Sequence, residues 1–356
     1  MSTHTRNDFR RIVNEQQDGI CIIPWCDESI QDAHHIIERE LWDDGGYIPD
    51  NGAGVCGLHH KFAEENHIPP QAFWKWRTID DPPLPDGIST TNVNKWGDEL
   101  DYPPWKEHRE RIKYPSTRHL PFSHVGDADD TYHRSVESFL GVPLVILEKM
   151  DGSNAMLMKD IDEPVRARNG REAEHDSFDL LKDLYWNENI HEKIPETVQV
   201  FGEWLYEKHS IHYGCDCNDS DCDVGKPLTA NLRKSEPTDE RAYFQIFGVY
   251  DMELDYWLSW PFTVEISQEL GFPTAPVLLQ APNDDSPSYT RRNVFYNEII
   301  DESESVVNRG GEGLVVRSKF PYHYGQFSER VGKYVRENHV KTDKHWSIQS
   351  NPRNKL

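Results

Sequence analysis

The sequence contains no apolar run of the length that a membrane-spanning helix requires, about 20 residues. Its first residues, MSTHTRNDFRR, lack the apolar core of a secretory signal peptide. Internal repeats and low-complexity segments are also absent. These absences exclude membrane and repeat proteins, and we expect a cytoplasmic protein. The chain has 356 residues, which is long enough for two domains.

Positive charge is scarce, because 38 lysine and arginine residues stand against 62 aspartate and glutamate residues, for a net charge of -24. An acidic protein repels polyanions, so a phosphate ligand must meet a locally basic surface. Basic strings occur at residues 106–113, 166–171 and 330–344. A further hypothesis is a very salty cytoplasm, where long-range repulsion is screened.

Cysteine is rare, and three of the six cysteines lie within one short region. Cys21 and Cys26 form one pair, and Cys56 with His59 forms a second pair about 30 residues later. Two such pairs of sulfur or imidazole ligands are typical of a structural zinc site. Because thiols stay reduced in a cytosol, zinc is favoured over disulfides. We predict that these four residues bind Zn²⁺.

The other three cysteines lie in an acidic insertion at residues 214–240. Together with His209 or His212 they have the donor types of a second zinc site. Incidental cysteines in an acidic loop explain the pattern equally well, so both interpretations stay open for Cys215, Cys217 and Cys222.

Lys149 stands between the apolar segment 142–147 and an Asp151-Gly152 pair. The apolar run predicts a buried strand, and Asp-Gly-Ser-Asn predicts the turn that ends it. A lysine at the end of a strand is partly desolvated, which lowers the pKa of its amine and makes the neutral amine a nucleophile.

Further segments follow in the order that a covalent nucleotidyltransferase needs. Residues 166–170 (RARNG) supply guanidiniums for phosphates. Residues 243–251 (YFQIFGVYD) predict a strand that offers an aromatic ring to a purine. Glu203 and Glu312 lie in or beside apolar strands, where a buried carboxylate needs a partner. We expect the two glutamates to hold a divalent cation or a ribose hydroxyl; salt-bridged strand acids are the alternative for either one alone.

From residue 113 to residue 346 the chain resembles the ATP-dependent RNA ligases of the covalent nucleotidyltransferase superfamily, and especially the bacterial and phage-like repair RNA ligases without an appended C-terminal domain. The strings that carry the resemblance are KYPSTRHLPFS, EKMDGSN, ARNG, FGEWLYEKHSIHY, YFQIFGVYD, GGEGLVVR and GKYVRENHVKTDKHW. The resemblance implies an α+β fold with the antiparallel sheets of a ligase nucleotidyltransferase domain. It also implies three steps: self-adenylation, transfer of AMP to an RNA 5′-phosphate, and attack by a 3′-hydroxyl.

The resemblance implies that Lys149 attacks the α-phosphate of ATP, while Glu312 helps to hold Mg²⁺ or Mn²⁺. Lys333 matches the first lysine of the last motif, which neutralises the α-phosphate and the pyrophosphate leaving group. The family often has Lys-x-Lys there, whereas this chain has Lys-Tyr-Val. The second cation is therefore Arg336 or Lys341, or is missing.

Other contacts to the nucleotide follow from the same resemblance. Asn154 is expected near the reacting 5′-phosphate end, and Arg168 is expected to contact the nucleotide. Glu203 is expected to bind the ribose. Tyr250 is expected to stack on adenine, with Phe247 as the alternative ring.

Within residues 19–67 the chain resembles the HNH nuclease motif of the ββα-metal fold. The resemblance implies that His35 is a general base, that Asn51 fixes its loop, and that His60 with His34 or Asp32 holds a divalent metal. The alternative is a zinc-stapled module that only binds nucleic acid or supports the ligase.

We therefore expect an HNH-like zinc module at residues 1–68, an irregular connector at 69–107 and a nucleotidyltransferase domain at 108–356. Residues 176–187 have the apolar spacing of a surface helix. The connector is rich in tryptophans that we expect to pack rather than to bind bases: Trp74, Trp76 and Trp96.

The expected function is ATP-dependent RNA ligation with RNA as the partner, with DNA tolerance, oligomeric state and cleavage by the HNH-like module left open. A DNA ligase is an alternative, but such enzymes usually carry a C-terminal oligonucleotide-binding domain, and only about 20 residues follow Lys333. A capping guanylyltransferase lacks support for the same reason. A catalytically silent nucleic-acid-binding protein is disfavoured by the complete set of Lys149, Glu203, Glu312 and Lys333.

Overall fold

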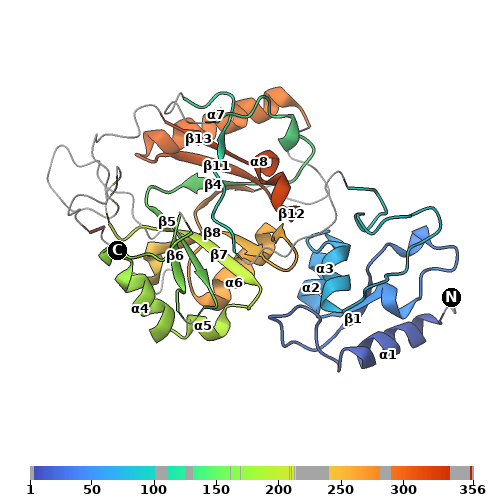
Figure 1. Cartoon of the computed structure of the whole chain (residues 1–356). Coiled ribbons are helices and arrows are strands. Elements are labelled where there is room, and N and C mark those ends of the chain that lie inside the picture. The colour runs from blue at the N-terminus through green and yellow to red at the C-terminus, as the bar shows by residue number, and fades with distance from the viewer. Residues whose placement is uncertain are drawn as a thin grey trace. The chain divides into compact units, whose positions relative to one another are not determined.

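The computed structural model describes residues 4–100, 111–124, 131–160, 162–168, 170–207, 209, 211, 213, 240–280, 290–336 and 353–354. The chain divides into a small unit, residues 1–108 with 253–255, and a large unit, residues 109–252 with 256–356 (Figure 1). Among the described helices, none is long and apolar enough to cross a membrane.

The small unit contains a two-stranded antiparallel sheet followed by a helix. Its elements are α1 (Arg6–Gln16), β1 (Asp32–His35), η1 (Arg39–Leu41), η2 (Pro49–Asn51), β2 (Gly52–Val55), α2 (Gly57–Glu64) and α3 (Pro70–Trp76). Thr5 caps α1 by accepting a hydrogen bond from the Asp8 N–H at 3.2 Å. Helix α1 packs closely on β2, since a Cβ at Gly52 would lie 2.6 Å from Cγ2 of Val13.

The connector differs from its expected irregular form, because residues 70–76 form helix α3. Pro70 at the first helical position has the fixed φ that a helix start needs. Trp74 is buried, in line with a packing role, but Trp96 is 48% exposed and does not pack as expected. Lys95 lies over the Trp96 ring, with 5.3 Å from Nζ to the centroid.

Within its described residues, the large unit contains two sheets and several helices. Its strands are β3 (Arg118–His119), β4 (Leu144–Lys149), β5 (Ser153–Met158), β6 (Val165–Ala167), β7 (Val198–Trp204), β8 (Phe244–Asp251), β9 (Tyr256–Trp257), β10 (Val277–Gln280), β11 (Gly313–Ser318), β12 (Tyr322–His323) and β13 (Val331–Val335). Its helices are η3 (Glu137–Phe139), η4 (Asp176–Phe178), α4 (Asp179–Asn187), α5 (Ile190–Lys193), η6 (Glu240–Tyr243), α6 (Trp260–Leu270), α7 (Arg292–Asn308), η7 (Tyr324–Gln326) and α8 (Phe327–Arg330).

The first sheet has the described strand order β10-β4-β11-β13-β3, antiparallel except for the parallel pair β13 and β3. Side chains alternate along β4, so its two faces meet different cores. Leu144 and Ile146 pack with residues of α7, which covers this face in Figure 1. Val145 and Leu147 pack with Trp260 on the opposite face, to which Lys149 also belongs by alternation.

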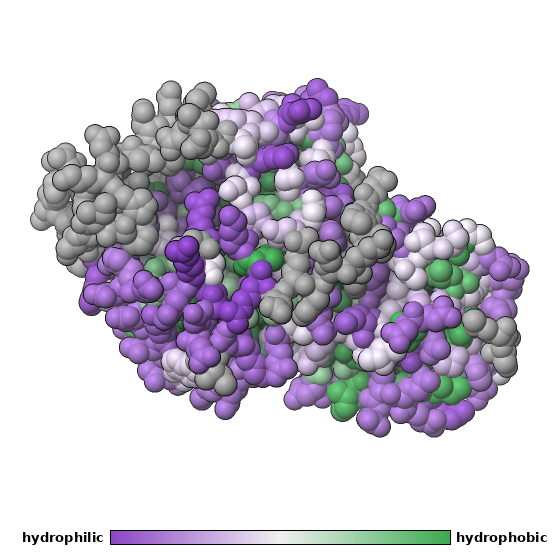
Figure 2. Space-filling view, in the orientation of Figure 1, coloured by the Kyte–Doolittle hydropathy of each residue, from purple (hydrophilic) through white to green (hydrophobic). Residues whose placement is uncertain are grey.

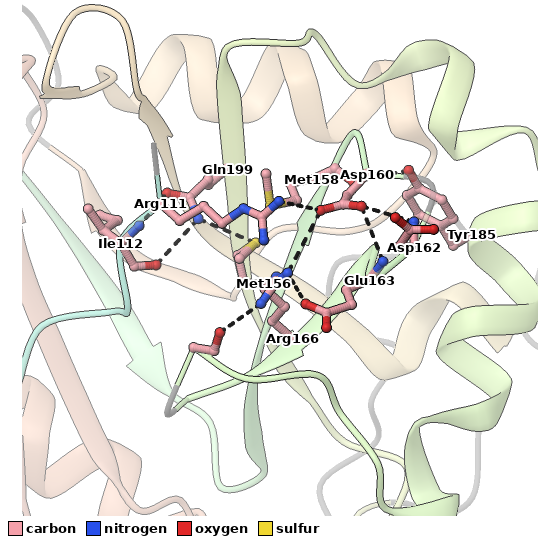
Figure 3. Close-up of polar contacts among 11 residues, drawn as sticks. Arg111, Ile112, Met156, Met158, Asp160, Asp162, Glu163, Arg166, Tyr185 and Gln199 are labelled. Carbon is pink, nitrogen blue, oxygen red and sulfur yellow. Dashed lines mark hydrogen bonds and ion pairs between the residues drawn. The ribbon is translucent and has the colours of Figure 1, made fainter. Parts of the chain in front are cut away.

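The second sheet has the described order β12-β9-β8-β7-β5-β6 and is antiparallel throughout. Ile112, at the start of the large unit, is tied to β7 by two hydrogen bonds with the Gln199 amide, at 3.0 and 3.3 Å (Figure 3). Tyr250 and Trp257 lie in the core of this sheet.

The expected mixed α+β fold with antiparallel sheets is confirmed. The four expected strands appear as β4, β7, β8 and β11, and the expected surface helix appears as η4 followed by α4. The face seen in Figure 2 is mostly hydrophilic, in keeping with the charge of the sequence, and hydrophobic residues interrupt it in scattered places.

Candidate functional site

Lys149 ends β4 and lies opposite Gly313, the first residue of β11. Glu312 directly precedes β11 and is 5% exposed. The Lys149 Nζ donates a hydrogen bond to Glu312 Oε2 at 2.6 Å. Two predicted site residues that are far apart in the sequence are therefore in direct contact.

The charge state of Lys149 differs from the expectation of a lowered pKa. Burial alone lowers the pKa of this amine, but the carboxylates of Glu312 and Glu203 outweigh burial and raise it. The sequence argument counted desolvation and omitted the carboxylates, because they come from other strands. In the free protein the amine is thus an ammonium paired with Glu312.

Glu203 lies on β7 opposite Asn154 of β5, and its Oε1 accepts a hydrogen bond from the Gly152 N–H at 3.1 Å. Burial raises the pKa of Glu203 to about 7, although the Lys149 ammonium acts in the opposite direction. The site therefore combines two carboxylates with one ammonium, and deprotonated Glu203 leaves it with excess negative charge.

The turn after Lys149 is held by hydrogen bonds from Ile211 and Tyr213, two residues that were not predicted as site residues. The Asp151 N–H donates to the Tyr213 hydroxyl at 3.0 Å, and the Ile211 N–H donates to Asp151 Oδ2 at 2.6 Å. Gly152 is required next to it, because a Cβ there would lie 2.6 Å from the carbonyl oxygen of Trp204. The available signal was the tyrosine that ends the string FGEWLYEKHSIHY.

The structure separates the two candidate stacking rings. Tyr250 is 0% exposed and has ring neighbours Trp257 and Tyr324, so the initial choice of this ring is disfavoured. Phe201 of β7 lies opposite Gly248 of β8, but the next residue, Gly202, lies opposite Ile246. Phe247 is therefore the extra residue of a bulge in β8. Bulges re-aim side chains beside active sites, and Phe247 is only partly buried.

The predicted cations have different surroundings. Lys333 lies on β13 opposite Val315 of β11 and His119 of β3, and it is partly buried. Arg336 is partly buried, and its Nε and Nη2 have no hydrogen-bond partner among the described residues. Buried guanidinium nitrogens normally have acceptors, so the Arg336 guanidinium is suited to an anionic ligand.

The two arginines of residues 166–170 differ in their contacts, because Arg166 is hydrogen-bonded within the protein and Arg168 is exposed. Arg166 is buried, contacts Glu163 and Asp160, and donates to the Gly170 carbonyl at 3.0 Å (Figure 3). Its proposed phosphate contact is therefore disfavoured. Arg168 is exposed. Several residues named in the sequence analysis lie outside the described residues: Lys341, His212, Cys215, Cys217 and Cys222.

In the small unit the four predicted zinc ligands form one group. One ligand atom from each of Cys21, Cys26, Cys56 and His59 lies within 4.8 Å of every other. The His59 Nδ1 is 3.2 Å from Cys56 Sγ and 3.4 Å from Cys21 Sγ. Three sulfurs and one imidazole at such distances have the donor set of a tetrahedral zinc site.

A second group contains His34, His60 and Glu64, also within 4.8 Å of one another. Glu64 Oε1 is 3.0 Å from His34 Nδ1 and 3.4 Å from His60 Nε2. Glu64 was missed in the sequence, although its position four residues after His60 on α2 puts both on one helix face. Lys95 already contacts this group, with its Nζ 3.6 Å from Glu64 Oε2. Asp32 instead pairs with Arg10 at 3.1 Å.

His35 does not share the surroundings of His34. Neighbouring strand residues point to opposite faces, and the His35 ring stacks on Phe9 at 4.7 Å and lies 5.4 Å from Tyr47. Burial lowers the pKa of His35 to about 4. Asn51 holds the chain just after it, since its Oδ1 accepts from the Ile37 N–H at 2.9 Å. In this arrangement His35 is packed, rather than presented beside the group of His34 and Glu64.

Comparisons with solved structures find ligase folds at low identity. An archaeal ATP-dependent RNA ligase has 13% identity and a TM-score of 0.38, covering 63% of this chain and 48% of that one. Naegleria gruberi RNA ligase with pyrophosphate has 14% identity and a TM-score of 0.36, covering 67% and 62%. A variant of the same ligase with ATP and Mn has 15% identity and a TM-score of 0.34, covering 56% and 51%.

The chain spans about half the length of the archaeal ligase. No match is found among curated proteins. The sequence profile of the RNA ligase family matches residues 142–335, more than half of the chain, and includes Lys149, Glu203, Glu312 and Lys333. The chain therefore belongs to the RNA ligase family.

Proposed function

We propose that the protein is an ATP-dependent RNA ligase that joins a 3′-hydroxyl to a 5′-phosphate through an AMP intermediate on Lys149. The observation that carries the proposal is the contact of Lys149 Nζ with Glu312 Oε2 at 2.6 Å, beside Glu203. Both residues lie in the region that matches the family. The contact places the amine that would attack ATP beside a carboxylate that controls its protonation.

In the first step the Lys149 amine attacks the α-phosphorus of ATP. A nitrogen–phosphorus bond forms, the bond from phosphorus to the bridging oxygen breaks, and pyrophosphate leaves with that electron pair. The ammonium must first lose a proton, and Glu312, already its hydrogen-bond acceptor, takes it. AMP then moves to an RNA 5′-phosphate, and the 3′-hydroxyl displaces AMP. Positioning and charge neutralisation supply most of the rate in such steps.

The donor set suits a divalent cation, because Glu203 and Glu312 add two carboxylates to a site with one ammonium. These glutamates would hold Mg²⁺ or Mn²⁺. Glu203 is also proposed to accept a hydrogen bond from a ribose hydroxyl. When bound, the ion neutralises the charge that develops on the leaving pyrophosphate.

The remaining nucleotide contacts follow from exposure and pairing. Phe247, in the bulge of β8, is proposed to stack on adenine in place of Tyr250. Lys333 and Arg336 are proposed to contact the phosphates. Asn154, opposite Glu203 on β5, and the exposed Arg168 are proposed to meet the 5′-phosphate end of RNA.

The experiment is transfer of label from α-labelled ATP to the protein, followed by sealing of nicked, bridged and single-stranded RNA. Lys149→Ala should abolish labelling, and Lys149→Arg should be nearly as inactive because a guanidinium keeps its proton. Lys159→Ala is the matched control, since Lys159 is exposed and pairs with Glu196.

An adduct of full yield in Lys149→Ala would overturn the proposal. Sealing of DNA in preference to RNA would favour the DNA ligase alternative, and failure of the unchanged protein to label would favour a silent nucleic-acid-binding protein.

A second proposal concerns the small unit: an HNH-like module within residues 1–68 that binds one Zn²⁺ and a second divalent metal. It is supported by the two metal-suited groups and by the order β1, β2, α2. Cys21, Cys26, Cys56 and His59 would hold the structural Zn²⁺, which would crosslink the module. His34 and His60, with Glu64 added, would hold the other ion.

Cleavage of nucleic acid is the test of this module. If His35 is the general base, His35→Ala should abolish cleavage and leave the zinc content unchanged. The packing of His35 on Phe9 requires its ring to move for that role. A protein that contains zinc but cleaves neither RNA nor DNA would leave the module as a binding or supporting device.

A further inference from the structure

One asparagine joins several backbone segments of the large unit. Asn354 is 2% exposed. Its Nδ2 donates to the carbonyl oxygens of Leu205 at 2.6 Å and Glu207 at 3.1 Å. Its Oδ1 accepts a hydrogen bond from the Tyr213 N–H at 2.9 Å. Both the donor and the acceptor of the amide are therefore used, which aspartate or leucine at this position would not reproduce.

The backbone of Asn354 is held as well. Its N–H donates to the Tyr206 carbonyl at 2.9 Å, and its carbonyl accepts from the Tyr243 hydroxyl at 2.8 Å. Buried hydrogen bonds of this number fix a residue in one place, because breaking any of them leaves a buried polar group unsatisfied.

Tyr213, whose N–H donates to the Asn354 amide oxygen, also holds the turn that follows Lys149. Tyr213 is 1% exposed, and its hydroxyl accepts from the Asp151 N–H at 3.0 Å. The same segment reaches the Asp151 side chain, to which the Ile211 N–H donates at 2.6 Å. Asp151 is two residues after Lys149. A continuous path of hydrogen bonds thus leads from Asn354 through Tyr213 to the turn that follows Lys149.

We propose that Asn354 is a positioning residue for adenylation of Lys149, acting through Tyr213 on the turn at Asp151. This inference rests on the proposed function. Attack at phosphorus requires the amine to lie in line with the bond to the leaving pyrophosphate, and an error of about 1 Å costs about 100-fold in rate. A turn anchored at both its backbone and its side chain limits that error. Asn354 supplies the fixed end of the anchor.

The test measures single-turnover labelling by α-labelled ATP at varied ATP concentration. Asn354→Ala and Tyr213→Phe should each slow labelling about 10- to 100-fold. The ATP concentration for half-maximal rate should stay within about twofold, because base and phosphate contacts come from other elements. Tyr185→Phe is the matched control: it removes the hydroxyl of another buried tyrosine, on α4, which donates to the Met158 carbonyl at 3.0 Å.

The double variant identifies the route. Tyr213→Phe cuts the link to the Asp151 N–H and leaves the bond from the Ile211 N–H to Asp151 Oδ2. Adding Asn354→Ala should therefore cause a further loss of rate that is much smaller than its loss as a single variant, although it should lower the melting temperature further. Tyr213→Phe labelling at the rate of Tyr185→Phe would overturn the proposal, even if Asn354→Ala fails to fold. Multiplying losses in the double variant would overturn it as well. Absence of labelling in the unchanged protein would overturn the proposed function itself, whereas normal labelling in all variants would overturn the positioning role alone.

Discussion

The two units differ in what surrounds their charged groups. In the large unit, Lys149 ends β4 and Glu312 directly precedes β11, and apolar residues of these strands pack in clusters on both sides of the sheet. In the small unit, the strands β1 and β2 have four residues each, and the buried polar residues His34, Asn51 and His59 lie within or directly beside β1, β2 and α2.

This contrast teaches that buried polar residues serve different ends in the two units. The small unit buries apolar residues such as Phe9, Val13 and Phe73, and we expect its ligand groups to add a metal crosslink to this core. A large core tolerates a costly ion pair because the surrounding strands remain in place when the pair changes. Loss of a site residue should therefore impair chemistry in the large unit and folding in the small one.

The largest expected effect is the removal of zinc from the small unit. Structural zinc contributes about 10–16 kcal/mol in zinc-finger peptides, so Cys56→Ser or a strong chelator should unfold the small unit. The large unit should keep labelling by ATP. Metal analysis, limited proteolysis and label transfer measure the three outcomes.

Cys222→Ser is the control for that experiment, because Cys222 belongs to the acidic insertion whose zinc binding is open. Retention of a full complement of zinc in Cys56→Ser would contradict the predicted ligand set. A loss of zinc in Cys222→Ser would reveal a second site.

The next effect is loss of chemistry without loss of fold. Glu312→Gln should slow adenylation by about 10²- to 10³-fold, or about 3–4 kcal/mol, with an unchanged melting transition. Because Glu312 raises the pKa of Lys149, its removal should also move the rising limb of the pH–rate profile to lower pH. Glu304→Gln, an exposed acid on α7, is the control. Unfolding of Glu312→Gln would contradict the expectation that loss of a site residue in the large unit impairs chemistry and not folding.

A smaller effect separates the two aromatic rings. Phe247→Ala should weaken ATP binding by about 1 kcal/mol through lost stacking. Tyr250→Leu removes the other ring but keeps an apolar side chain in the core, and it should leave ATP binding unchanged. Isothermal titration with a non-hydrolysable ATP analogue measures both. Weaker binding by Tyr250→Leu alone would restore the initial choice of ring.

The smallest effect is the pH dependence of stability caused by Glu203. Its pKa is raised from 4.5 to about 7 in the folded protein, so between these values the folded state holds a proton that the unfolded state has lost. The free energy of unfolding should therefore fall as pH rises from 4.5 to 7. Glu203→Gln removes this contribution.

Melting temperatures of the unchanged protein and of Glu203→Gln, measured across that pH range, check the prediction. The variant should gain stability relative to the unchanged protein with rising pH and level off above pH 7. A constant difference would contradict the raised pKa.

Local pattern predicted the strands β4, β7, β8 and β11, because long apolar runs bounded by turn residues have few other stable conformations. It also predicted the four zinc-suited residues, whose pairing is visible as short spacings. It failed for helix α3, where proline and tryptophan content suggested an irregular connector. It failed again for Glu64, whose partner His34 comes from another element.

The sequence by itself determined which residues are proposed to carry the chemistry, since lysine, paired glutamates and a Cys-His set are properties of residue type and order. The tertiary structure decided the state of those residues. Lys149 has a raised pKa because strands β7 and β11 bring Glu203 and Glu312 to it, which no local spacing encodes. The anchoring of Asp151 by Tyr213 and Asn354 is likewise a product of long-range contacts. Electrostatic and hydrogen-bond energies depend on distance in space, and chain folding sets that distance.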